Sequence, residues 1–262
     1  MMTKINLSEV SKTAILTLIG KSAGHKSRFI EDKKSLSCVT NLVDSVSGKD
    51  KKWVLKIQKK FKGIFKKINT YILCKRVLSF DKFINNYISK NNNCTVINLA
   101  CGFDTRFWRI DNKKCNYVEL DFPEVIKLKS FLLKGDMPYK VISSSVLDFS
   151  WIKKVTIPKN HKFLIVAEGL FMYLKKQEAM DLVKNIADSF EDSMMIFDSS
   201  YKRYTRGLGK WFVKFKFKNI GINTEFTYGI ENPHYLESYS DKIKVQNVKS
   251  SIVGSLITLS IK

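Results

Sequence analysis

The chain has 262 residues, of which 44% are hydrophobic and 12% aromatic, so it can bury a full core and is not an intrinsically disordered protein. It carries 46 Lys and Arg against 24 Asp and Glu, and its net charge of +22 admits nucleic acid, an anionic membrane or an acidic protein as a partner. No apolar run reaches the ~18–20 residues of a transmembrane helix, and residues 1–21 lack the layout of a signal peptide, so we expect a cytoplasmic protein.

The first distinctive segment is residues 51–76, "KKWVLKIQKKFKGIFKKINTYILCKR", which contains ten Lys or Arg and no acid. A second helix is expected from about residue 81 to Ser89, and "KNNN" at 90–93 predicts a turn. We therefore divide the chain into a helical lid and substrate-binding extension, residues 1–90, and a second domain, residues 91–262. Apolar residues of the basic segment recur at steps of four and three, which predicts one helix with one apolar face: Trp53, Ile57, Phe61, Ile64, Ile68 and Ile72.

After that turn, segments typical of strands and of helices alternate. Length and β-branching predict five buried strands, at residues 94–99, 115–120, 139–145, 161–169 and 193–200. Helical spacing is found at residues 123–134 and 175–190, and residues 241–262 have the pattern of two strands in a closing hairpin. Such alternation predicts an α/β fold, a Rossmann-like sheet of seven mostly parallel strands with a C-terminal antiparallel hairpin.

Acidic residues follow the ends of these predicted strands, at Asp104, Asp121, Asp148, Glu168 and Asp198. Ligands of such sheets bind beyond the carboxyl ends of the strands. Asp121 lies 19 residues past Gly102, close to the ~20-residue spacing at which an acid reaches the ribose hydroxyls of a nucleotide-like cofactor. The alternatives are a purely structural turn and helix N-caps.

The turn "ACG" at residues 100–102 has small side chains, so a ligand can approach its backbone. The phosphate-binding patterns GxGxxG and GxxxxGK[ST] are absent, and an acid two residues after Gly102 would repel a pyrophosphate. An adenosine cofactor with a cationic centre fits better, which favours S-adenosylmethionine. The five cysteines form no CxxC pair and the three histidines stand apart, so we expect no metal site.

Three blocks of the sequence, "VINLACGFDTRFWRI", "YVELDFPEVIKLK" and "IVAEGLFMYL", resemble the leucine carboxyl methyltransferase family, including its bacterial polyketide O-methyltransferase branch. That family shows a pattern like LGxGxDTRxxRL, then E-x-D-x-P, then EGxxxYL. All three blocks occur in this order, and the resemblance is clear over roughly residues 76–200. It implies a class I methyltransferase that uses S-adenosyl-L-methionine.

The resemblance also implies roles for residues around the methionine part of that cofactor. Arg76 matches the arginine that binds the cofactor carboxylate, for which a guanidinium fork is well suited. Lys12 corresponds to a second cation near the same carboxylate. Ala100 and Gly102 line the turn under the methionine moiety, and many family members have glycine where Ala100 stands. Glu168 matches a glutamate beside the cofactor's amino group and the transferring methyl.

The remaining implied roles concern the adenosine and the acceptor end. Asp121 matches the acid that binds the ribose. Asp148 and Phe149 match an Asp-Leu pair that holds the adenine. Tyr173 is expected, together with Glu168, at the methyl-transfer end, although a packing role is the alternative. The DTRxxR residues are expected to brace the turn and the first helix: Asp104, Thr105, Arg106 and Arg109.

A second basic segment, residues 202–218, also lacks acids, and with residues 51–76 it holds 17 of the 46 cations. Both segments could be solvated helices, or could meet an acidic partner or an anionic membrane surface. Nucleic acid is not expected, because no RNA-binding motif is present. Three functions therefore stand open: O-methylation of a small-molecule or carrier-bound natural product, carboxyl methylation of a protein or peptide C-terminus, and a non-catalytic adaptor at a membrane or RNA.

Overall fold

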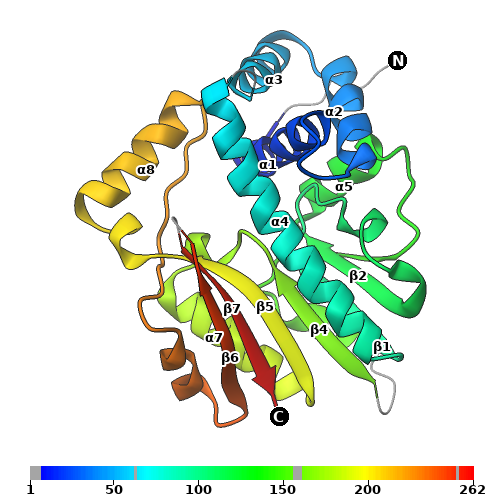
Figure 1. Ribbon diagram of the computed structural model, residues 1–262, viewed down its shortest axis with the longest axis vertical. Helices are drawn as coiled ribbons and strands as arrows, with labels where there is room; N and C mark the ends of the chain where they lie inside the picture. The colour runs from blue at the N-terminus through cyan, green and yellow to red at the C-terminus, as the bar shows by residue number, and fades with distance from the viewer. Residues whose placement is uncertain (1–6, 62–63, 156–160, 252–253) are drawn as a thin grey trace.

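The chain begins with helices. The computed structural model describes residues 7–61, 64–155, 161–251 and 254–262 (Figure 1). The first elements are α1 (Glu9–Lys26), α2 (Lys33–Ser45), α3 (Gly48–Lys60) and α4 (Ile64–Lys90). The sheet starts only after α4, at Cys94. No helix within the described ranges is long and apolar enough to cross a membrane.

Seven strands form one sheet in the order β3-β2-β1-β4-β5-β7-β6. The parallel strands are β1 (Cys94–Leu99), β2 (Cys115–Asp121), β3 (Lys140–Ser143), β4 (Lys162–Ala167) and β5 (Ser193–Ser200). The closing hairpin is antiparallel, β6 (Ile243–Ser250) and β7 (Gly254–Ile261), with β7 paired to β5. The predicted Rossmann-like fold is confirmed. The strand order reverses beside β1, the position where such sheets bind ligands.

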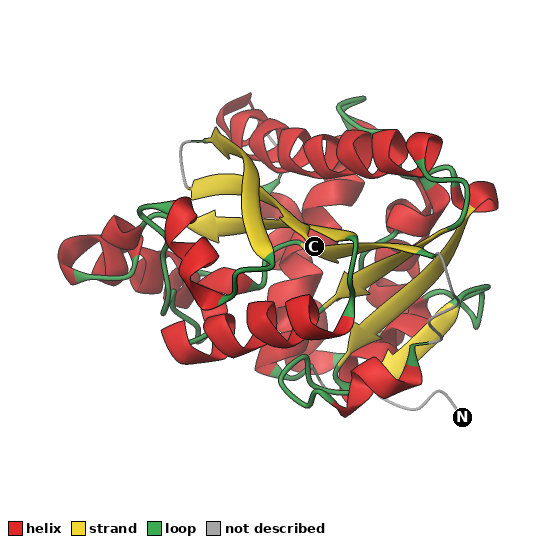
Figure 2. Ribbon diagram, turned by 90° about the horizontal axis from the view of Figure 1, so that it is seen from below, coloured by secondary structure: helices red, strands yellow, loops and turns green. Residues whose placement is uncertain are grey.

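Helices cover both faces of the sheet (Figure 2). Successive residues of a strand point to opposite faces, so Ile97 packs with α7 (Lys176–Ser189) on one face while Val96 packs with α4 on the other. A third core joins α1, α2 and α3 to α5 (Pro123–Leu132) at the side of the sheet. The other described helices are α6 (Ser150–Lys154), α8 (Gly207–Asn219), η1 (Arg106–Trp108), η2 (Asn112–Lys114), η3 (Phe171–Tyr173), η4 (Lys202–Tyr204) and η5 (Pro233–Tyr239).

The prediction of a single helical face over residues 51–76 is wrong. Helix α3 ends at Lys60, and α4 starts at Ile64 and runs on through the separately predicted helix at 81–89. Because the periodicity is counted across a break between two helices, it does not describe one face. Ile68, placed on the predicted apolar stripe, is 59% exposed.

Helix α4 joins the N-terminal helices to the sheet. Its second half buries Phe80, Ile84 and Ile88 against the same core as Val96 and Leu164 of the sheet. Its first half reaches past the sheet edge and lies beside α1. The helix is therefore shared by the predicted extension and by the sheet on which that extension rests.

Candidate functional site

A cavity of about 500 Å³ lies at the carboxyl ends of β1, β2 and β4, with α1 and α4 forming its wall. It brings together six of the predicted site residues, which come from α4, from the three strand ends and from η3: Arg76, Ala100, Gly102, Asp121, Glu168 and Tyr173. These residues are up to 97 positions apart in sequence. The strand ends that carry four of them are neighbours because β1 pairs in parallel with β2 and with β4.

The turn after β1 presents backbone to the cavity. Ala100 and Gly102 both have left-handed backbone, with φ of 47° and 51°. A Cβ added to Gly102 would lie 3.2 Å from the Ala14 Cβ, so this position has little room for a side chain. Ala100 tolerates the same conformation at a cost of roughly 1–2 kcal/mol, which glycine would not incur. The turn is therefore strained at the position where relatives of the predicted family often have glycine.

Asp121 holds this turn in place. Its two carboxylate oxygens accept the backbone N–H groups of Gly102 at 2.6 Å and Phe122 at 2.7 Å. Burial raises the pKa of the Asp121 carboxyl, and the two backbone hydrogen bonds act against that rise. Each carboxylate oxygen can still accept a further hydrogen bond. Asp121 can therefore brace the turn and bind a hydroxyl group of a ligand together.

Glu168 lies between two arginines. Arg76 Nε donates to its Oε1 at 3.0 Å, and Arg106 forms a close ion pair with its Oε2. Burial raises the pKa of the Glu168 carboxyl, but Arg76 and Arg106 outweigh burial and hold that pKa below its usual value. Arg76 also pairs with Asp198, at 3.3 Å, and Asp198 accepts the Gly169 N–H at 2.6 Å. Glu168 is therefore an anion at neutral pH.

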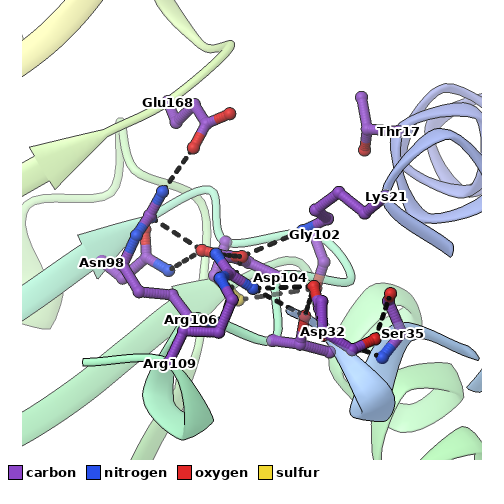
Figure 3. Close-up of polar contacts among 12 residues, drawn as sticks. Thr17, Lys21, Asp32, Ser35, Asn98, Gly102, Asp104, Arg106, Arg109 and Glu168 are labelled. Carbon is purple, nitrogen blue, oxygen red and sulfur yellow. Dashed lines mark hydrogen bonds and ion pairs between the residues drawn. The ribbon is translucent and has the colours of Figure 1, made fainter. Parts of the chain in front are cut away.

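A buried ionic network holds Glu168 in position (Figure 3). Arg106 is fully buried and pairs with Asp81 of α4 at 2.8 Å and with Asp104 at 2.7 Å, besides Glu168. Arg109 joins the same two aspartates and also Asp32, at 2.9 Å, ahead of α2. The network links α4, the β1 turn and the end of β4 into one unit.

Lys12, Asp148 and Phe149 do not line the cavity within the described residues. Lys12 pairs with Glu9 at 2.8 Å on the surface of α1. The exposed Asp148 carboxylate accepts from Ser144 and Ser150, and Phe149 packs against the main core. Their predicted roles stay predictions.

Sequence reasoning missed Lys21, which does line the cavity and whose Nζ lies 2.9 Å from Asp104. Thr17 and Thr13 line the cavity too, one and two turns before Lys21 on α1. The regular step of four residues was the available signal. The sequence pattern identifies Asp198 only as an acid at a strand end and does not predict its contact with Arg76.

The far end of the cavity is apolar and aromatic. Tyr173 and Phe226 meet edge to face at 5.6 Å between ring centroids, and Phe217 of α8 meets Phe226 at 5.9 Å. The segment after α8 is tied to η3 by the Thr227 N–H, which donates to the Met172 carbonyl at 2.8 Å. Burial raises the pKa of the Tyr173 hydroxyl to about 12. The cavity can thus hold a ligand with one polar and one apolar end.

The side chains available for acid–base chemistry in the described lining of the cavity include carboxylates, a lysine and a tyrosine. No histidine is among the described residues that line the cavity. No cluster of His, Cys, Asp or Glu there has the arrangement of a metal site.

Comparison with known proteins places these observations in a family. A model of the family described as "Leucine carboxyl methyltransferase" matches residues 23–187. The tetracenomycin polyketide synthesis O-methyltransferase TcmP of Streptomyces glaucescens is 28% identical over 188 residues, covering 70% of this chain and 67% of that protein. The S-adenosyl-L-methionine-dependent methyltransferase dpfgK of Gibberella zeae is 22% identical over 252 residues, covering 92% and 82%.

Among solved structures, the chain resembles the magnesium protoporphyrin IX methyltransferase of Synechocystis with bound SAH. The TM-score is 0.50 at 9% identity, and the match covers 72% of this chain and 82% of that one. A likeness at this identity concerns the fold alone.

Proposed function

We propose a reaction for this protein from one premise, which is that the chain belongs to the leucine carboxyl methyltransferase family. It is a methyltransferase that depends on S-adenosyl-L-methionine. The proposed acceptor is an oxygen, carboxylate or hydroxyl, of a small-molecule or carrier-bound natural product. The observation that carries this proposal is a single cavity with ionic groups at the strand ends and aromatic side chains at the other end.

The residues present fit the cofactor. In the proposed assignment, Arg76 binds its carboxylate, and the Nη2 group of Arg76 donates to no other described residue. Glu168 binds its amino group, and the free acceptor capacity of Asp121 serves the ribose. The left-handed turn at Ala100 and Gly102 lets the methionine part lie against backbone. When bound, the cofactor supplies an electrophilic methyl group on a sulfonium.

The chain itself contributes alignment and exclusion of water more than proton transfer. Glu168 is held as an anion by two arginines, so it is a weak base, and Tyr173 with a pKa of about 12 stays protonated at neutral pH. A carboxylate acceptor needs no base, whereas an ordinary phenol or alcohol does. Within the proposal, an acceptor oxygen that is already anionic at neutral pH is therefore favoured.

Transfer of labelled methyl groups from the cofactor to cell extract tests this function. We expect the label in the small-molecule fraction, and for a carboxylate acceptor we expect mild alkali to release it as methanol, because esters hydrolyse and ethers do not. Label in the protein fraction would favour the second candidate, carboxyl methylation of a protein C-terminus, which the name of the matching family supports. If calorimetry shows that the protein binds the cofactor but no labelled methyl group is transferred, the protein would be a non-catalytic binding module.

Replacing Asp121 with alanine should weaken cofactor binding about 10- to 150-fold, since a charge-assisted hydrogen bond is worth roughly 1.5–3 kcal/mol. Calorimetry with S-adenosylhomocysteine measures this effect. Asp111→Ala removes the same charge from an exposed position and should leave the affinity unchanged. Unaltered binding in a folded Asp121→Ala protein would reduce Asp121 to a brace of the turn.

A further inference from the structure

Helix α8 carries an apolar stripe that faces solvent. Leu208, Trp211, Phe212 and Phe215 follow the i, i+3, i+4, i+7 spacing of one helix face. They are 86%, 62%, 46% and 47% exposed, and none of the 13 residues of α8 is buried. Exposed apolar patches of this kind mark interaction surfaces. Figure 1 shows α8 standing out from the body of the molecule, away from the sheet.

Cations surround the stripe. The helix contains four lysines and no acid, and two arginines precede it: Arg203, Arg206, Lys210, Lys214, Lys216 and Lys218. Lys216 lies 4.4 Å from the centre of the Phe212 ring, so charge and apolar surface are interleaved. Glu225, which follows the helix, pairs with Lys210 at 2.9 Å and with Lys214 at 3.3 Å. One carboxylate against this number of cations leaves the helix strongly positive.

The end of α8 meets the other basic segment. Trp53 Nε1 of α3 donates to the Ile220 carbonyl at 2.6 Å, and Lys60 Nζ lies 3.5 Å from the Asn219 carbonyl. Segments about 160 positions apart in the sequence thus form one basic surface, here called the α3–α8 surface and made of residues 48–60 and 207–220. The two lysine-rich helices are therefore joined where α8 ends.

We propose that the α3–α8 surface binds an anionic lipid bilayer, with α8 lying in the plane of the interface. Helices that do so have Trp, Phe and Leu on one face and Lys or Arg around it. Leu208, the most exposed of the four, has no group that could stack on a base or form a hydrogen bond, which favours lipid over RNA. The charge of the surface complements acidic headgroups. This inference is independent of the proposed reaction.

Vesicle sedimentation tests the surface with no reading of enzymatic activity. The full chain is mixed with phosphatidylcholine vesicles, with and without phosphatidylglycerol, at ~0.05 M and ~0.5 M salt. We expect binding only to the anionic vesicles and weaker binding at the higher salt. The triple variant Lys214→Gln, Lys216→Gln, Lys218→Gln should bind about 100-fold more weakly. The matched control changes three exposed lysines elsewhere, Lys113, Lys134 and Lys153, and should bind within about 3-fold of wild type.

A second variant, Leu208→Ser with Phe212→Ser, keeps every charge and should lose at least about 10-fold in binding. Quenching by brominated lipid should fall when Trp211 is replaced by phenylalanine, which identifies the inserted helix. Three outcomes would overturn the proposal. The wild-type protein does not bind anionic vesicles, or the variants bind them as tightly as wild type. In the third, the wild-type protein is a dimer in solution and the Leu208→Ser, Phe212→Ser variant is a monomer. Binding of RNA or of an acidic protein without binding of vesicles would overturn the proposal in the same way as the first outcome.

Discussion

Replacing Arg106 with leucine is expected to lower the free energy of unfolding by about 3–5 kcal/mol. The Arg106 side chain is fully buried and forms ion pairs with Asp81, Asp104 and Glu168. Leucine fills part of the space but leaves three carboxylates close together with less positive charge among them. The Asp104 pKa, held well below its usual value by Arg106, Lys21 and Arg109 against the effect of burial, would rise in the variant.

Urea unfolding measures this loss, and two further variants interpret it. Arg206→Leu removes an exposed arginine and should change stability by less than about 0.5 kcal/mol. Arg106→Lys keeps a charge but not the planar fork that reaches several carboxylates at once, so an intermediate loss is expected. If Arg106→Leu proves too unstable to purify, Arg106→Lys still decides the matter. A fully stable Arg106→Lys protein would contradict the bridging role.

The second large effect is expected from Lys129→Met. Lys129 and Glu119 are both buried, and the Lys129 Nζ donates to Glu119 Oε2 at 2.6 Å. Removing the lysine leaves an uncompensated carboxylate in the core, which should cost about 3–5 kcal/mol at pH 7. The double variant Glu119→Gln with Lys129→Met has no buried charge at this place. Its stability should return to within about 2 kcal/mol of wild type.

The pH dependence of the Lys129→Met variant has a definite sign. Burial already raises the pKa of the Glu119 carboxyl, and Lys129 acts against that rise. Without Lys129 the folded-state pKa is higher still, so the folded protein binds a proton that the unfolded chain does not. Stability should therefore increase as the pH falls from about 8 to about 5, and decrease again as it rises. Urea unfolding at several pH values checks this, and a pH-independent loss would show that Glu119 is not the cause.

Both predictions concern buried charged residues near the cavity that are not among its described lining residues. Arg106 links the end of β4 to the turn after β1 through Glu168 and Asp104. Glu119 belongs to the E-x-D block of the family, but it does not line the cavity within the described residues. Its ion pair with Lys129 instead connects β2 to α5. Glu119 precedes Asp121 by two residues in β2. The two acids of that block thus have different surroundings, one inside the core and one at the cavity.

The sequence alone determined the sheet and the region of the site. Short, β-branched runs of residues predict strands, and each of the seven predicted strands is present in the structure, although β3 and β6 are largely exposed. The acids at strand ends could also be located, because parallel strands bring their carboxyl ends to one edge whatever the details of packing. The strand-end pattern identifies Asp121 and Glu168, the family resemblance identifies Arg76, and the structure brings all three to one cavity.

Tertiary structure alone decided how the helices divide and pair. Periodicity cannot show where one helix stops and another starts in phase. The pattern of residues 51–76 therefore predicts one helix, although α3 and α4 share these residues. Lys21 reaches Asp104 across 83 positions, and α3 meets the end of α8 across 167. Such contacts depend on the packing of whole elements, which no local spacing encodes. For the same physical reason, the contact between α3 and α8 and the exposure of the apolar stripe of α8 are properties of the fold.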